Sequence, residues 1–136
     1  MISDDESLMP EPEAEFDALT GNVIGAAIEV HRQLGPGLDE GLYENALAIE
    51  LRLRGIKFSR QVIVPVVYRG EGIGEKRLDL VIEGKLVVEL KAVEQIASVH
   101  KAQVLTYLKI TGLRLGLLIN FNVPALKEGI KRIIRK

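Results

Sequence analysis

The chain contains no cysteine and no tryptophan, and only 4% of its 136 residues are aromatic. Without cysteine it can form neither a disulfide framework nor a thiolate metal site, which fits a reducing cytoplasm. The low aromatic content argues against binding of single-stranded nucleic acid by base stacking alone. No apolar run approaches the roughly 20 residues that span a bilayer, and the N-terminus lacks the basic and apolar regions of a secretory signal. We therefore expect a soluble, cytoplasmic protein that does not enter membranes.

Basic residues are also missing from the first 20 positions, which hold seven acids. These acids are Asp4, Asp5, Glu6, Glu11, Glu13, Glu15 and Asp17. We expect residues 1–18 to form an acidic flexible tail and residues 19–136 to form one domain. Residues 21–136 hold 18 basic and 12 acidic residues, a net charge of +6. That charge is compatible with a polyanionic partner, although many inert domains carry a few excess lysines.

The pattern of apolar residues predicts an alternation of helices and strands in one layered domain. Thr20 is expected to cap a first helix that ends at Leu34, and a second helix follows over 39–54. β-Branched residues predict strands at 56–68, 76–82 and 85–91, with Pro65 indicating an edge strand or a bulge. Ser98 is expected to cap a helix that Gly112 ends. Residues 115–120 predict a buried strand, and an amphipathic helix is expected from Ala125. The order ααβββαβα gives an α/β (α+β-like) fold with a mixed sheet of about four strands.

The hairpin at 79–91 (DLVIEGKLVVELK) carries three charged residues that are expected to share one face. Side chains alternate between the two faces of a strand, so Asp79 lies on the face opposite to that of Leu80. In the same way, Glu89 and Lys91 lie on the face opposite to that of Leu90. A two-residue loop would mix aliphatic and acidic faces, whereas a three-residue loop with a left-handed Gly84 pairs Ile82 with Leu86. Asp79 then lies across from Glu89, with Cβ atoms about 4.5–5.5 Å apart. We predict that register.

Two carboxylates at that separation repel each other unless a cation lies between them. Mg²⁺ or Mn²⁺ prefers oxygen ligands and is commonly held by one or two carboxylates, waters and substrate phosphate. Lys91 would lie on the same face and could assist an attacking water. The alternative is an exposed cross-strand set in which Lys91 merely neutralises one acid. For an isolated D…ExK pattern that alternative is the stronger one, so the pattern needs corroboration.

Two other places bear on the choice. Gln103 and Tyr107 are four residues apart in a predicted helix and so share one of its faces, although a core tyrosine and a surface glutamine explain the pair equally well. His31 lies on the apolar stripe of the first helix. In isolation, a histidine there is more often a buried side chain held by one backbone partner than a metal ligand.

The chain resembles a known family at residues 37–43 and beyond. Gly37, Glu40 and Tyr43 follow the pattern G-x-x-E-x-x-Y, and VHRQLGPG precedes them. With the late segment LLINFNVPALKEGIKRI, this resembles the GxxExxY family of the PD-(D/E)xK nuclease superfamily from about Leu19 to the C-terminus. The resemblance implies a restriction-endonuclease-like core. One departure is that Leu78 stands where the proline of "PD" would be.

The resemblance also implies roles for individual residues. Asp79 matches the first strand acid, Glu89 and Lys91 match the ExK pair, and Glu40 matches a helix-borne acid of the metal site. Gln103 and Tyr107 match the QxxxY helix that positions the scissile strand. The implied catalytic residues are Glu40, Asp79, Glu89, Lys91, Gln103 and Tyr107. The implied ligands of Mg²⁺ or Mn²⁺ are Asp79, Glu89, Glu40, the Leu90 carbonyl and His31.

These observations favour metal-dependent phosphodiester hydrolysis of nucleic acid, with DNA as the expected substrate and homodimerisation as a further expectation. Basic residues could contact the phosphate backbone, although a solvated helix face explains them as well. They are Lys101, Lys109, Arg114, Lys131, Arg132, Arg135 and Lys136. Two other functions stay open: a non-catalytic nucleic-acid or protein-binding module that keeps the fold, and a hydrolase of small phosphorylated molecules.

Overall fold

The computed structural model describes residues 11–136, with side chains described from Asp17 onwards. Its helices are α1 (Glu11–Leu34), α2 (Glu40–Leu53), α3 (Ser98–Thr111) and the short 3₁₀ helix η1 (Leu126–Gly129). Its strands are β2 (Phe58–Tyr68), β3 (Glu71–Ile82), β4 (Leu86–Lys91), β5 (Leu115–Asn120) and β6 (Ile130–Ile134). In this part of the chain, no helix has the length and apolar character needed to cross a membrane.

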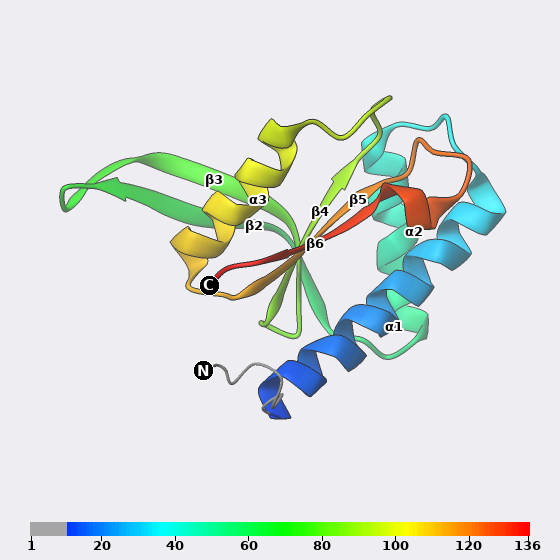
Figure 1. Cartoon of the computed structure of the whole chain (residues 1–136), viewed down its shortest axis with the longest axis horizontal. Coiled ribbons are helices and arrows are strands. Elements are labelled where there is room, and N and C mark those ends of the chain that lie inside the picture. The colour runs from blue at the N-terminus through cyan, green and yellow to red at the C-terminus, as the bar shows by residue number, and fades with distance from the viewer. Residues whose placement is uncertain (1–10) are drawn as a thin grey trace.

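The five strands form one mixed sheet in the order β2-β3-β4-β5-β6. β4 and β5 run parallel, whereas every other neighbouring pair is antiparallel. The sheet lies between α1 and α2 on one side and α3 on the other (Figure 1). The predicted α+β layer fold with a mixed sheet is confirmed, with five strands in place of about four. This is the architecture expected of a restriction-endonuclease-like core.

Each face of the sheet has its own apolar core. Leu80, Val88 and Leu117 pack toward α1 and α2, and Val87 and Leu118 pack toward Val104 and Leu108 of α3. All residues of β5 are buried, as expected for a parallel strand covered on both faces. Because α3 covers the second face, side chains of β4 that point away from the first core are also enclosed.

The amphipathic helix predicted from Ala125 is wrong. After one 3₁₀ turn the chain enters β6, which pairs antiparallel with β5 from Ile119↔Ile130 to Leu115↔Ile134. Strand β5 is buried, so the backbone groups along its free edge require hydrogen-bonding partners. β6 supplies them, and this tertiary requirement overrides the local pattern of isoleucines.

The first helix begins at Glu11, so the predicted start with Thr20 as cap is wrong. Residues 11–18 of the predicted flexible tail are helical, and residues 1–10 of it lie outside the described residues. Pro12 is tolerated because the first turn of a helix needs no partner for its backbone N–H. Asp17 pairs with Arg132 of β6, with Oδ1 and Nη2 2.7 Å apart.

The β2–β3 hairpin extends beyond the rest of the sheet and runs past α3 (Figure 1). We call residues 62–77 the arm. Its turn is at Arg69-Gly70, and β3 begins at Glu71, five residues earlier than predicted. β2 is an edge strand, and the ladder shifts register between Val66 and Val67. Both findings agree with the interpretation of Pro65 as a mark of an edge or a bulge.

Candidate active site at the β3–β4 hairpin

The β3–β4 hairpin has the predicted register. Ile82 pairs with Leu86 and Leu80 with Val88, and Gly84 is left-handed with a φ of 67°. Continuing this register by one residue places Asp79 across from Glu89. The backbone N–H of Leu90 donates to Asp79 Oδ2 at 2.8 Å, and the backbone of Asp79 acts on Glu89 to lower its pKa. The strand that carries Glu89 thus fixes the Asp79 carboxylate.

The strand β3 is locally distorted at Asp79. The β2–β3 ladder runs through Arg60↔Leu80 and Val62↔Leu78 but omits the pair between Gln61 and Asp79. Gln61 has a positive φ of 51°, which is uncommon outside glycine. Leu78 packs in the α3 core, whereas Leu80 packs in the α1/α2 core. Residues i and i+2 of a regular strand share one face, so alternation is interrupted where Asp79 leaves the ladder.

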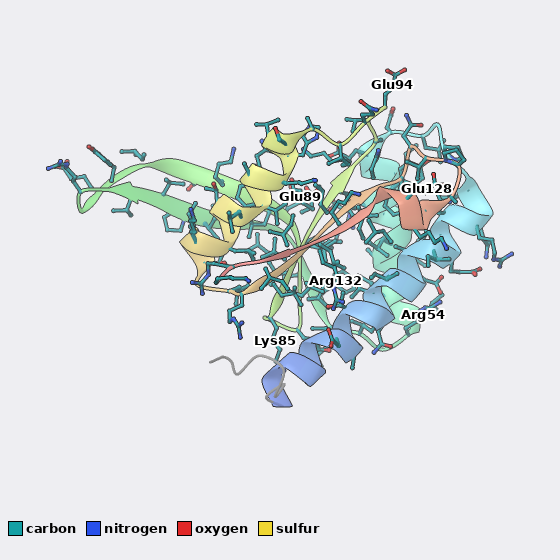
Figure 2. The ribbon with its side chains drawn as sticks, viewed as in Figure 1. Arg54, Lys85, Glu89, Glu94, Glu128 and Arg132 are labelled. Carbon is teal, nitrogen blue, oxygen red and sulfur yellow. The ribbon has the colours of Figure 1, made fainter. Side chains whose placement is uncertain are left out.

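Glu89 is enclosed by the sheet and α3, with only 6% of its surface exposed. Figure 2 shows it beside α3 in the body of the molecule, whereas Glu94 points outward from the loop after β4. Burial raises the pKa of Glu89 to about 8, the charge of Asp79 adds to the rise, and Lys91 opposes it. Glu89 Oε1 is buried without a hydrogen-bond partner. The alternative of a solvent-exposed cross-strand set is therefore wrong for Glu89.

Asp79, Glu40 and Lys91 act electrostatically on one another and on Glu89. Burial raises the pKa of Asp79, and the hydrogen bond from Leu90 and the charge of Lys91 counteract the rise. Burial also raises the pKa of Glu40, the charge of Asp79 adds to it, and Lys91 again opposes it. One lysine thus acts on three acids, of which Glu89 is buried and Glu40 lies at the exposed surface. Three ionised carboxylates there are unfavourable without a further positive charge or a proton.

The segment Gly37–Tyr43 explains how Glu40 reaches this space. Glu40 is the first residue of α2. Tyr43 Oη donates to the Gly35 carbonyl at 2.5 Å and accepts from the Leu38 N–H at 3.1 Å. The Tyr43 ring stacks on Phe121, with centroids 4.5 Å apart. Tyr43 therefore fixes the turn before α2, and this turn sets where the helix and its first acid begin.

Helix α3 brings Gln103 and Tyr107 over the same face. Tyr107 is 4% exposed, and burial and the charges of Glu89 and Asp79 raise its pKa. Gln103 Oε1 is buried without a hydrogen-bond partner. The structure thus brings together Glu40, Asp79, Glu89, Lys91 and Tyr107, with Gln103 one turn away on the same helix.

Sequence reasoning missed a polar network behind Asp79. Gln61 Nε2 donates to Glu44 Oε1 at 2.8 Å, and a side-chain hydrogen bond from Gln61 lowers the pKa of Asp79. Arg60 Nε is 3.0 Å from Glu44 Oε2, and Glu44 is only 7% exposed. Gln61 thus links Asp79 to the ion pair between the buried Glu44 and the exposed Arg60. An isolated glutamine in a strand carries no pattern that would have singled it out.

A second missed residue, Asn120, holds the chain just after Lys91. Its Oδ1 accepts from the Val93 N–H at 3.0 Å, and its Nδ2 donates to the Val93 carbonyl at 2.8 Å. Asn120 is 1% exposed and pairs with Lys91 in the parallel β4–β5 ladder. The two hydrogen bonds to Val93 and the ladder pairing with Lys91 therefore hold the chain in place at the end of β4.

The structure does not bring His31 into the acidic group. His31 Nε2 donates to the Val123 carbonyl at 2.8 Å, and its ring lies 6.4 Å from that of Phe121. It is 7% exposed. This is the arrangement of a buried histidine held by one backbone partner, the alternative that the sequence left open.

Two of the basic residues expected at a phosphate backbone are held by partners within the fold. Arg132 is paired with Asp17, and Arg135 donates to the carbonyls of Leu113 at 2.9 Å and Gly112 at 3.0 Å. Both arginines lie at the β6 end of the chain, and β6 is the edge of the sheet opposite β2. Lys109 lies instead beside the arm.

A divalent cation fits the donor set at Asp79 and Glu89, where a buried carboxylate oxygen lacks a partner and acids outnumber the nearby lysine. Among residues 11–136, however, no three His, Cys, Asp or Glu side chains form a ready group of metal ligands. A cation would therefore be held by two carboxylates with water and a main-chain oxygen, which is the usual arrangement for Mg²⁺.

The chain matches a known protein family. The sequence profile of the PD-(D/E)XK nuclease superfamily matches residues 17–133, a range that includes Glu40, the β3–β4 hairpin and α3. The profile does not separate the GxxExxY family from the rest of the superfamily. Neither the curated proteins nor the solved structures give a match.

Proposed function

The chain belongs to the PD-(D/E)XK nuclease superfamily, and from that premise we propose that it is a Mg²⁺-dependent nuclease that hydrolyses phosphodiester bonds in DNA. We further propose that it is a member of the GxxExxY family. The observation that carries the proposal is the buried Glu89 carboxylate, which has an unpartnered oxygen beside Asp79 and a single lysine. An inert domain gains no stability from such a group.

The proposed metal ligands are Asp79, Glu89 and the Leu90 carbonyl. A bound Mg²⁺ would polarise the phosphate and lower the pKa of a water at the site. Glu40 would contact the cation through a water, because its charge already acts on Asp79 and Glu89. No role in metal binding is proposed for His31.

The remaining residues act on the water and the substrate. The Lys91 ammonium donates a hydrogen bond that orients the attacking water or offsets the charge that develops on the phosphate. Gln103 and Tyr107 hold the scissile strand from the α3 side, where Tyr107 Oη donates to a phosphate oxygen. The role of Gln103 follows from its buried, unpartnered carbonyl oxygen.

The proposal predicts metal-dependent stabilisation that requires Asp79. Mg²⁺ at 100-fold its Kd should stabilise the wild-type protein by about 2.7 kcal/mol, and Asp79→Asn should remove both this effect and DNA cleavage. Thermal unfolding with Mg²⁺ or Mn²⁺ and cleavage of labelled DNA measure the two. Asp39→Asn is the matched control, because Asp39 is exposed and its side chain makes no capping hydrogen bond. A wild-type protein that neither responds to these metals nor cleaves DNA or RNA would instead be a binding module.

Gln61 is predicted to position Asp79 for the metal. Gln61→Gly removes the side-chain link between Asp79 and Glu44 but keeps a residue that adopts positive φ without strain. We expect Mg²⁺ binding to weaken by about 10- to 100-fold, the usual effect of losing a group that orients a metal ligand. Calorimetric titration measures it, with Gln95→Gly in an exposed loop as control. Unchanged Mg²⁺ affinity would show that Gln61 has no such role.

A further inference from the structure

A groove runs between the arm and α3. Its inner part, about 370 Å³, is lined by Val66 and Lys76 of the arm and by Ala102, Gln103, Thr106 and Tyr107 of α3. A second hollow of about 450 Å³ shares Val66 and Thr106 with the first and extends it toward Lys109. The two hollows therefore form one continuous groove along α3, on the side where the arm runs past the helix (Figure 1).

Tyr107 connects the groove to the acidic site. Tyr107 lines the groove, and the charges of Glu89 and Asp79 act on its hydroxyl. Gln103, one turn earlier, also lines the groove and has a buried oxygen without a partner. A molecule lying in the groove would thus meet a hydroxyl group on which the charges of both carboxylates act.

The lining of the groove combines apolar walls with two lysines. Val66 and Ala102 provide aliphatic contact, Lys76 lies on the arm side, and Lys109 lies on the α3 side. A nucleic-acid strand is complementary to this lining. Its bases have flat apolar faces that can contact the aliphatic walls, and each nucleotide carries a negatively charged phosphate that can pair with a lysine. Base contact in this groove would be with aliphatic side chains, which is consistent with an aromatic content of only 4%.

We propose that the groove between the arm and α3 holds one unpaired nucleic-acid strand and leads it to Asp79 and Glu89. This inference rests on the proposed nuclease function and specifies its substrate. A B-form duplex, whose major groove alone is about 12 Å wide, is too broad to enter between a hairpin and a helix that already contact each other. The Gln103 oxygen accepts a hydrogen bond from a base, and the lysines contact the phosphates on either side.

The test compares one labelled DNA sequence as a single strand, as a blunt duplex and as a duplex with single-stranded tails. In Mg²⁺ or Mn²⁺ we expect the wild-type protein to cleave the single strand and the tails at least tenfold faster than the blunt duplex. Thr106→Trp, at an exposed position of α3, fills the groove. It should lower cleavage of the single strand at least tenfold and leave hydrolysis of bis-p-nitrophenyl phosphate unchanged. Ile49→Trp, at an exposed position of α2, is the matched control.

Each other outcome overturns a defined part of the proposal. Equal or faster cleavage of the blunt duplex, or wild-type cleavage by Thr106→Trp, rules out the groove as the path of the strand. A wild-type dimer that Thr106→Trp converts to a monomer in light scattering shows that a second copy occupies the groove. If the wild-type protein hydrolyses neither DNA nor bis-p-nitrophenyl phosphate, the proposed function itself fails.

Discussion

Replacing Lys91 with methionine should lower the rate of phosphodiester cleavage by about 10²- to 10⁴-fold, the usual contribution of a positioned group that assists proton transfer. Lys91 is the positive charge that opposes the upward pKa shifts of Glu40, Asp79 and Glu89. Methionine keeps much of the length of the side chain and removes only the ammonium group. The loss should appear in kcat at saturating Mg²⁺, because Lys91 acts on the reacting groups.

The same substitution should not weaken metal binding. Without the Lys91 charge, the carboxylates attract a cation more strongly, so the Kd for Mg²⁺ should stay the same or fall. Lys127→Met is the control, because Lys127 is an exposed lysine of η1. A Lys91→Met protein with the wild-type kcat would remove Lys91 from the reaction. Weaker Mg²⁺ binding in that variant would indicate a structural role for the lysine.

Without a divalent cation, the stability of the fold should decrease as pH rises from about 4.5 to about 8. The ordinary pKa of glutamate is 4.5, and burial raises that of Glu89 to about 8. Between these values the native state keeps a proton that the unfolded state has released. The stabilisation is therefore fully present below pH 4.5 and is lost as pH rises through the native pKa. A few kcal/mol are at stake, because each pKa unit corresponds to about 1.4 kcal/mol.

Urea unfolding in EDTA between pH 5 and pH 8 measures this effect. Glu89→Gln should flatten most of the slope, and the remaining slope belongs to Asp79 and Glu40, whose pKa values are also raised. Glu128→Gln, at an exposed position, should leave the slope unchanged. Mg²⁺ should restore stability at pH 8, where it competes with a proton on only about half of the native Glu89 carboxylates. A wild-type stability that stays constant across this range in EDTA would show that Glu89 is not held in a dehydrated environment.

The hairpin that carries the acids could be predicted from sequence because its information is local. The three-residue loop, the left-handed Gly84 and the aliphatic pattern of residues 80–90 together admit one register, and the structure has that register. The end of α3 at Gly112, with a φ of 77°, is equally local. The helix predicted over 39–54 lies close to α2 (Glu40–Leu53), although the role of Tyr43 in holding the preceding turn required coordinates.

Other features depend on contacts that the sequence does not show. The isoleucines at 130, 133 and 134 fit a helix as well as a strand, and the choice is made by the unpaired edge of β5. The acids of 11–17 indicated a flexible tail, yet acidic residues also favour the first turns of a helix. The distortion of β3 at Asp79 and its link to Gln61 depend on a neighbouring strand. Glu89 is buried because α3 covers its face of the sheet. The alternation of side chains along β4 predicts which face Glu89 lies on, but not whether a helix covers that face.

Anomalous X-ray diffraction from crystals grown with Mn²⁺ tests most directly whether Asp79 and Glu89 share one cation. We expect one strong Mn²⁺ peak between the two carboxylates, at about 2.0–2.2 Å from an oxygen of each, and no such peak in Asp79→Asn crystals. Crystals saturated with Mn²⁺ that show no peak there, with Glu89 Oε1 still unpartnered, would contradict the metal site on which the proposed function rests.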